Sequence, residues 1–228
     1  SFLNFASTSP FPRMVIYFGS NPCSASKPAA DKQRPQGLLR RTMRMPLAWI
    51  LTGVMGLQST LIYTAAAWMP SYWRAQGMSF ETTGIWIFVF LFSGLPASVM
   101  TAKFFKVCPN DRTAGAVLTL LYVLGLAGWL AGGAWLLPAS VAAGAAQGAM
   151  LSAAFLLMAS HTKGSQAMLA VSTLSQGIGY LAAGAGPFIF GRLLQATGGW
   201  TAPFVFFTAV ILLWGLCVRL ADTHQTID

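Results

Sequence analysis

The polar side chains that could do chemistry in this chain lie inside long apolar stretches and carry no charge. The largest of them are the amides of Gln58, Gln147 and Gln176 and the phenols of Tyr63 and Tyr180. An amide without a partner is costly in hydrocarbon, so it must face protein or a wet cavity. We therefore take these five residues as the candidates for binding a small polar molecule, with helix packing as the alternative.

Helical spacing groups some of these side chains and separates others. Ser172, Gln176 and Tyr180 are spaced i, i+4 and i+8, which places them on one helix face. Gln58 and Tyr63 are about 140° apart on an ideal helix and need not share a stripe. The alternative role for all of them is to join neighbouring membrane helices by hydrogen bonds.

Residues that could form a catalytic or metal centre are scattered. His161 and His224 fall in predicted loops or the tail, without an acidic or cysteine partner at ligand spacing, and are expected at the surface. Cys23, Cys108 and Cys217 are odd in number and far apart, so they predict neither a disulfide framework nor a metal site. Hydrolase motifs such as GxSxG and HExxH do not occur. We expect no enzyme activity, no cofactor and no metal.

The composition indicates a membrane protein. Of 228 residues, 55% are hydrophobic and only 8% are charged, whereas a soluble domain carries about 25% charged residues. The net charge of +9 does not indicate nucleic-acid binding, because the basic residues separate long uncharged stretches instead of forming one amphipathic face. The surface must face lipid.

Gaps between charges mark the membrane spans, since a charge at mid-bilayer costs roughly 2.5–3.5 kcal/mol. The uncharged gaps are 45–73, 82–102, 113–162, 164–191 and 193–218. One span needs about 20 residues, so the long third gap holds two spans, divided by a turn at Gly132-Gly133-Ala134-Trp135. The predicted fold is an all-α integral membrane bundle of six transmembrane helices. Its approximate helices are 47–70, 80–104, 113–132, 135–159, 166–194 and 200–220.

The basic residues also predict the orientation, because cytoplasmic loops are enriched in Lys and Arg. Six spans put both termini on the same side. Nine basic residues fall on that side: Arg34, Arg40, Arg41, Arg44, Lys103, Lys106, Arg112, Lys163 and Arg219. Only Arg74 and Arg192 fall on the opposite side, so both termini are expected in the cytoplasm. Trp68, Tyr72, Trp73 and Trp200 then lie at the outer interface, where an aromatic belt is expected.

Three regions follow from these patterns. Residues 1–44 are rich in Pro and Ser and predict a mostly disordered, basic cytoplasmic leader. Residues 45–220 form the membrane domain, and residues 221–228 form a cytoplasmic tail. Within the membrane domain, glycine and alanine are dense in 142–149 and 177–191, which allows close and deformable helix contacts and mildly favours transport.

Two segments resemble a known family. These are LAWILTGVMGLQSTLIYTAAAWMPSYWRAQGMS at 47–79 and STLSQGIGYLAAGAGPFIFGRLLQATGGWTAPF at 172–204. With them, residues 46–220 resemble the C-terminal six-helix half of a major facilitator superfamily transporter, of the cyanate/nitroimidazole type. The family's cytoplasmic D-R signature is matched only by Asp111-Arg112, without its flanking pattern.

The resemblance implies an architecture. Such transporters have two halves, each built from two inverted three-helix repeats. The first and fourth spans of the half would line a central cavity, which makes Gln58, Tyr63 and Gln147 cavity residues. Gln176 and Tyr180 would lie at the interface between halves or in the cavity wall. The partner would be a second six-helix half, either a missing N-terminal half or another copy of this chain.

The resemblance also implies a function. We expect transport of a cyanate-like anion or a small polar organic molecule across a cell membrane, the inner membrane in a bacterium, by alternating access. The alternative is an inactive transporter fragment or an assembly subunit without transport of its own. The chain is then a truncated or frameshifted product, a fragment, or a true half-transporter. Any proton-coupling carboxylate would have to come from the other half, since these spans contain none.

Overall fold

The computed structural model describes residues 35–222 and Ile227, and this part of the chain is built from α-helices. The helices are α1 (Pro35–Thr42), α2 (Pro46–Ala75), α3 (Phe80–Val107), α4 (Asp111–Ala131), α5 (Leu136–Ser160), α6 (Ser165–Thr197) and α7 (Thr201–Ala221). Within the described residues, six helices, α2 to α7, are long and apolar enough to cross a membrane. The predicted six-span bundle is confirmed, and the chain is a multi-pass membrane protein.

Local capping explains where several helices begin and end. Ser79 accepts a hydrogen bond from the backbone N–H of Thr82 at the start of α3, and Asn110 accepts one from Thr113 at the start of α4. Gly132 and Gly133 have positive φ angles of 70° and 55° and lead through a short 3-10 turn, η1 (Gly133–Trp135), into α5. The turn predicted between the third and fourth spans is therefore confirmed.

Helix α1 is an addition to the predicted elements. It falls inside 1–44, where the composition predicted mostly disorder, and it packs against α6. Thr42 is buried, and Leu39 lies against the hydrophobic core, which explains why this segment is held as a helix. Residues 1–34 lie outside the described part of the chain, so for them the leader remains a prediction.

Helix α2 runs past Pro70 to Ala75, beyond its predicted end. Tyr72 and Trp73 in this extension are buried: the Tyr72 ring lies 4.8 Å from that of Phe204, and the Trp73 ring 5.6 Å from that of Trp129. These contacts outweigh the hydrogen bond that proline cannot donate. The aromatic-belt prediction is wrong for Tyr72 and Trp73, because their rings fill the protein interior.

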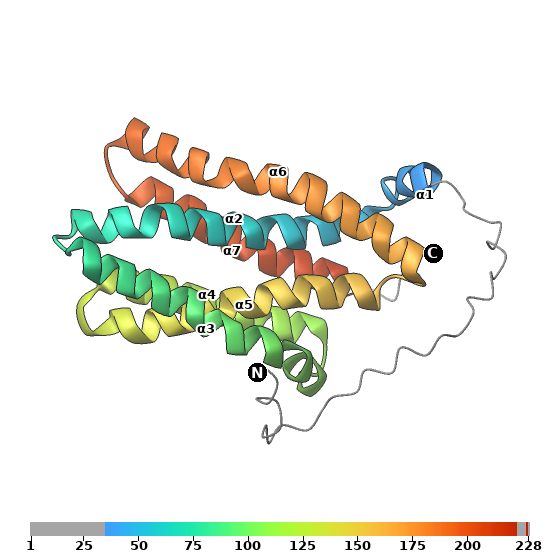
Figure 1. Cartoon of the computed structure of the whole chain (residues 1–228), viewed down its shortest axis with the longest axis horizontal. Helices are drawn as coiled ribbons and strands as arrows, with labels where there is room; N and C mark the ends of the chain where they lie inside the picture. Colours follow the sequence, from blue (N-terminus) through green and yellow to red (C-terminus); the bar gives the residue numbers. More distant parts are fainter. Residues whose placement is uncertain (1–34, 223–226, 228) are drawn as a thin grey trace, which may run out of the picture. The chain divides into compact units, whose positions relative to one another are not determined.

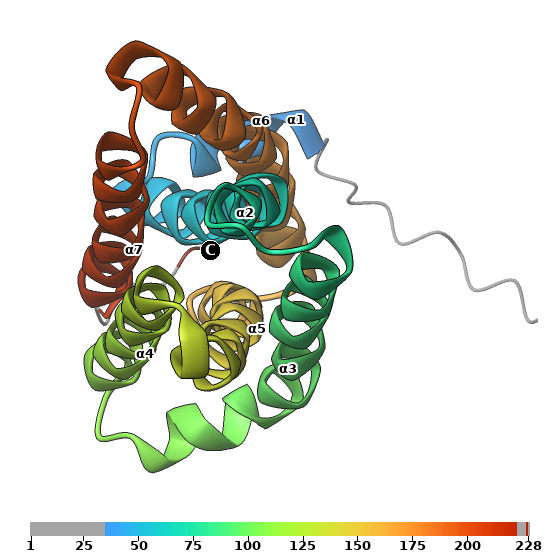
Figure 2. The same cartoon turned by 90° about the vertical axis from the view of Figure 1, so that its left-hand side faces the viewer.

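Helices α2 and α5 occupy the centre of the described bundle (Figure 1, Figure 2). Helix α3 packs along α5 as α6 packs along α2, and α4 contacts α5 as α7 contacts α2. Exchanging α2 with α5, α3 with α6 and α4 with α7 therefore leaves the pairing pattern unchanged. Helices α2, α3 and α4 form one unit, and α5, α6 and α7 form the other. Since each unit has three spans, an odd number, the two units run in opposite directions, as in inverted repeats.

Glycines let the flanking helices touch the central ones backbone to backbone. A Cβ atom on Gly56 of α2 would lie only 3.1 Å from the Cα of Gly179 in α6. On the other side of the bundle, a Cβ on Gly148 of α5 would collide with the backbone of Gly94 in α3. Such close approach is the usual way in which membrane helices gain packing energy.

The loop after α5 holds a buried histidine. His161 has only 6% of its surface exposed, and its Nδ1 lies 2.9 Å from the carbonyl oxygen of Leu157 and 3.0 Å from the Ser160 hydroxyl. The prediction of a surface histidine is wrong here, because the ring packs back on the last turn of α5, where carbonyl groups lack helical partners. His224 lies outside the described residues.

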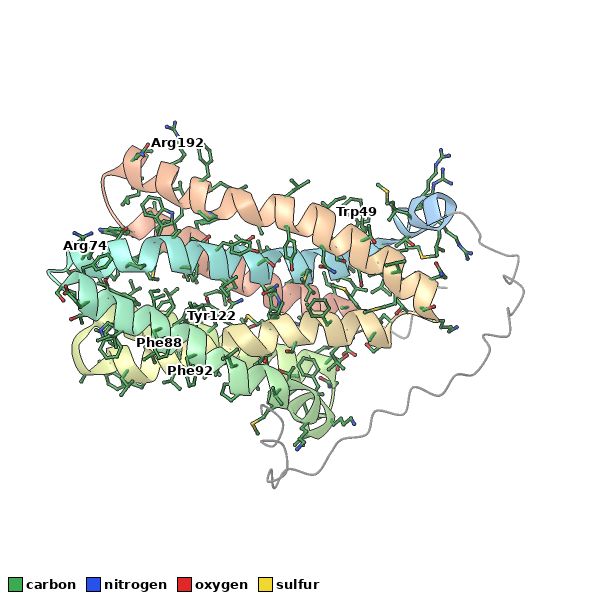
Figure 3. The ribbon with its side chains drawn as sticks, in the orientation of Figure 1. Trp49, Arg74, Phe88, Phe92, Tyr122 and Arg192 are labelled. Atoms are coloured by element: carbon green, nitrogen blue, oxygen red, sulfur yellow. The ribbon has the colours of Figure 1, made fainter. Side chains whose placement is uncertain are left out.

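Contacts between loops show which ends of the helices lie together. Arg112, at the start of α4, forms a 2.7 Å ion pair with Asp222, just after α7. The backbone of Ile227, a buried residue, forms hydrogen bonds of 2.8 Å with His161 and 2.9 Å with Lys163. The α3–α4 and α5–α6 loops therefore lie at one end of the bundle. Arg74 and Arg192 both lie at the opposite end, as the sequence predicted (Figure 3).

The glycine contacts predict unequal effects of the same substitution. Gly148→Val should destabilise the protein by about 1–3 kcal/mol, because the added carbons force α3 and α5 apart. Gly184→Val, on α6, is the matched control, since a Cβ there meets nothing within 4 Å. The measurement is the unfolding free energy in mixed detergent micelles. Equal losses in both variants would show that the α3–α5 contact is not close.

Candidate functional site

The buried polar centre of the bundle is a pair of glutamines on the two central helices. Nε2 of Gln147 on α5 donates to the backbone oxygen of Gln58 on α2 at 3.0 Å and to its side-chain Oε1 at 3.1 Å. Nε2 of Gln58 in turn donates to the Ser59 hydroxyl at 2.7 Å. Gln58 and Gln147 are 2% and 4% exposed. The pair therefore joins the two inverted units by hydrogen bonds within the span.

One oxygen atom of this network has no hydrogen-bond partner in the described structure. Oε1 of Gln147 is buried and finds no hydrogen-bond partner among the described residues. Both N–H groups of the same amide are committed to Gln58. Leaving such an acceptor unpaired costs about 1–3 kcal/mol, and this cost marks the Gln147 oxygen as a place where a ligand could bind.

A small pocket lies beside Gln147, between α3 and α5, with one residue from α2. Its volume is about 150 Å³, and it is lined by Ile62, Phe90, Leu91, Gly94, Leu95, Ser98, Gly144, Gln147, Gly148 and Leu151. Among these lining residues, Gln147 and Ser98 are the only ones with polar side chains, and none is charged. The pocket can hold a compact, mostly apolar molecule with a few polar contacts.

The other predicted site residues lie apart from the glutamine pair. Tyr63 on α2 and Tyr180 on α6 are 46% and 39% exposed. Gln176 is half-buried on α6. Its neighbour Ser175 is buried, and the Ser175 hydroxyl lies 3.3 Å from the Thr52 hydroxyl on α2. The five predicted residues thus separate into a buried pair and a partly exposed group.

Some pocket residues were not singled out from the sequence. Ser98 and Gly94 belong to the segment SGLPAS at 93–98, which has too few glycines to stand out beside 142–149 and 177–191. The signal that could have found them is the combination of small and polar residues next to Pro96 inside an apolar span. Such a combination favours close backbone contact in a membrane helix.

The chain is similar to two bacterial proteins that are named as transporters. It is 35% identical over 171 residues to the uncharacterized transporter YycB of Bacillus subtilis (strain 168), covering 74% of this chain and 42% of that protein. It is 23% identical over 181 residues to the 2-nitroimidazole transporter of Escherichia coli (strain K12), covering 78% of this chain and 46% of that protein. No protein-family model matches the chain. The chain therefore spans less than half the length of these two relatives.

The glutamine pair predicts coupled mutational effects. Gln147→Leu leaves the Gln58 oxygen unpaired, and Gln58→Leu removes one acceptor of Gln147. The double variant replaces both amides with apolar groups and should lose less stability than the two single losses added together. A coupling energy of about 0.6–1.7 kcal/mol is expected for a hydrogen bond between membrane helices.

The measurement is a double-mutant cycle of unfolding free energies in mixed micelles. Gln176→Leu serves as the control in combination with Gln147→Leu, because the described structure shows no bond between these two side chains. Strict additivity for Gln58 and Gln147 would contradict the hydrogen-bonded pair.

Proposed function

We propose that this chain is one six-helix half of a membrane transporter for a small solute, working by alternating access. The observation that carries the proposal is the 35% identity over 171 residues to a protein named as a transporter. Six apolar helices in the described chain, paired as inverted units around a buried polar centre, support it. The candidate binding residues are Gln58 and Gln147, with Tyr63, Gln176 and Tyr180 on the more exposed part of α2 and α6.

The second half would cover the side of the bundle flanked by α3 and α6. Helices α4 and α7 lie on the opposite side of α2 and α5 (Figure 2). Helix α3 is the least covered span of the described chain and exposes a stacked pair, Phe88 and Phe92, whose rings lie 5.4 Å apart (Figure 3). Tyr63 and Tyr180 add exposed phenols that a partner or a wet cavity would satisfy. The occupant is a second six-helix body, supplied by a longer chain or by another copy.

The solute is proposed to be a small polar organic molecule or a cyanate-like anion. One of the two relatives is named for 2-nitroimidazole, a compact polar heterocycle. Both relatives are bacterial, which supports placement in a bacterial inner membrane. With more basic residues at the α3–α4 and α5–α6 loops than at the opposite end, both termini are proposed to face the cytoplasm.

A second candidate function is a membrane subunit without transport of its own. It is supported by the length comparison, since the chain covers only 42% and 46% of its two relatives. A half-length body could assemble with another protein and leave the transport path to its partner. Uptake by the full chain in liposomes would exclude this candidate.

The uptake test uses the full chain reconstituted in liposomes with labelled 2-nitroimidazole or cyanate as probes. Transport predicts uptake above that of empty liposomes. Gln147→Leu should reduce this uptake by about tenfold or more, because a buried hydrogen-bonding group is lost. Gln166→Leu, at the exposed start of α6, is the control and should leave uptake unchanged. Uptake equal to that of empty liposomes would exclude transport by copies of this chain alone, and would leave either a half that a longer chain completes or the second candidate.

The orientation is tested by labelling cysteines with a membrane-impermeant maleimide. In a Cys23→Ser/Cys217→Ser background, Cys108 and an introduced Ser165→Cys should be labelled only from the cytoplasmic side. Gln76→Cys, added to a background without Cys108, should be labelled only from the outside. Labelling of positions 108 and 165 from opposite sides would overturn both the orientation and the six-span layout.

A further inference from the structure

We infer that the pocket beside Gln147 binds a compact, uncharged molecule that donates a hydrogen bond, and that it rejects anions. This inference rests on the proposed transport function and chooses between the two solute classes left open for it. It follows from the direction of the hydrogen bonds around the pocket, from the absence of charge among its described lining residues, and from its size.

The orientation of the Gln147 amide is fixed by the main chain of α2. Its Nε2 lies 3.0 Å from the backbone oxygen of Gln58, which can only accept. Turning the amide over would place Oε1 against that oxygen, two acceptors with no proton between them. Reorienting the Gln58 side chain does not remove this conflict, because the backbone carbonyl stays in place. The oxygen of Gln147 is therefore the group left for a ligand.

The unpaired Gln147 oxygen belongs to a side chain that lines the pocket. The side chain is one of the pocket's lining residues, and its Oε1 is buried without a partner in the described structure. Torsion about the last bond of a glutamine side chain is soft, and the inference requires a rotation that brings the Gln147 oxygen to the pocket surface. A ligand N–H or O–H that reaches it removes the penalty of an unpaired buried acceptor.

The second polar group of the pocket is also an acceptor. The Ser98 hydroxyl donates its proton to the carbonyl oxygen of Leu95 at 2.8 Å, so its lone pairs remain for a ligand. The other lining residues are glycines or carry apolar side chains. The pocket thus offers acceptors and no positive charge among its described residues.

Because the pocket offers hydrogen-bond acceptors, it favours uncharged hydrogen-bond donors over anions. An anion entering the pocket would lose its hydration and face two oxygen atoms that repel it, with no cation in the described lining to compensate. An uncharged N–H or O–H donor loses much less hydration and gains a partner. Cyanate is therefore disfavoured, and a neutral polar organic molecule is favoured.

The size of the pocket limits the ligand to about one ring. A cavity of about 150 Å³ is known to hold benzene when its walls are apolar, and this pocket has that volume. Gly94 of α3 and Gly144 and Gly148 of α5 bring the two helices close together at the pocket, and Phe90 contributes an aromatic ring to its lining. A five-membered heterocycle with one N–H group fits both the volume and the polarity.

The test compares two isomers of equal composition. 4-Methylpyrazole carries an N–H donor, whereas 1-methylpyrazole has its methyl group in place of that hydrogen. The full chain is placed in nanodiscs of uncharged lipid, and dissociation constants are measured by ligand-detected NMR, with empty nanodiscs subtracted for lipid partitioning. We expect 4-methylpyrazole to bind about tenfold more tightly, because its isomer leaves the acceptor unpaired. Cyanate should not compete.

Variants of the chain test whether the ligand binds in this pocket. Leu95→Trp should fill the pocket and abolish binding, whereas Leu212→Trp, on the exposed side of α7, adds the same ring outside it and should bind normally. Gln147→Leu should remove the preference between the isomers. The isomer comparison on the unmodified chain does not depend on that variant folding.

The outcomes are decisive in either direction. Equal affinity for the two isomers, competition by cyanate, or binding that survives Leu95→Trp would overturn the inference. Because binding is measured on the chain without any transport step, absence of uptake in liposomes would contradict transport by this chain alone and leave this result unaffected.

Discussion

A polar atom inside the hydrocarbon core can bond only with other protein groups, and this constraint organises the centre of the bundle. Two buried threonines of α2 meet it within their own helix: Thr52 donates to the carbonyl of Ala48, and Thr60 to that of Gly56. The longer amides of Gln58 and Gln147 bond across helices instead. This difference makes the glutamine pair the polar contact that fixes α2 against α5.

The same pair links the two inverted units. Gln58 belongs to the first unit and Gln147 to the second, while close glycine contacts attach α6 to α2 and α3 to α5. Each flanking helix thus packs mainly on a central helix of the other unit. Neither unit can bury its central helix alone, so the folded domain requires both. Pro96 on α3 and Pro187 on α6 interrupt helical bonding at the two flanks, where bending is tolerated.

Charge and glycine were sufficient to predict the spans, whereas side-chain neighbours were not predictable. The spans follow from gaps between charges because a charge in the bilayer is costly. The Gln58–Gln147 contact depends on which helices cross and at what depth, and the sequence does not give these. Both faces of a membrane helix are apolar, so hydrophobic periodicity cannot separate lipid-facing from protein-facing residues. For the same reason Trp73 was expected at the interface and is instead fully buried, and Gln176 does not join the buried amides. His161 escaped prediction because its partner is a backbone carbonyl, which every sequence has.

The positive charge of the described chain lies at the ends of the spans, whereas the pocket beside Gln147 lies near their middle, so the two affect a solute at different depths. Lys103, Lys106 and Arg219 lie near the end that holds the α3–α4 loop, and Arg74 and Arg192 lie at the other end. A charge at the end of a span is about 15 Å from the middle of a roughly 30 Å core, too far to contact a solute held beside Gln147. These cations can set the orientation of the helices and attract anions to the membrane surface. They cannot neutralise an anion beside Gln147, where the described lining offers only acceptors. Under the proposed function, discrimination between solutes depends on hydrogen-bond direction at the centre of the bundle, and the charge at its ends does not decide it.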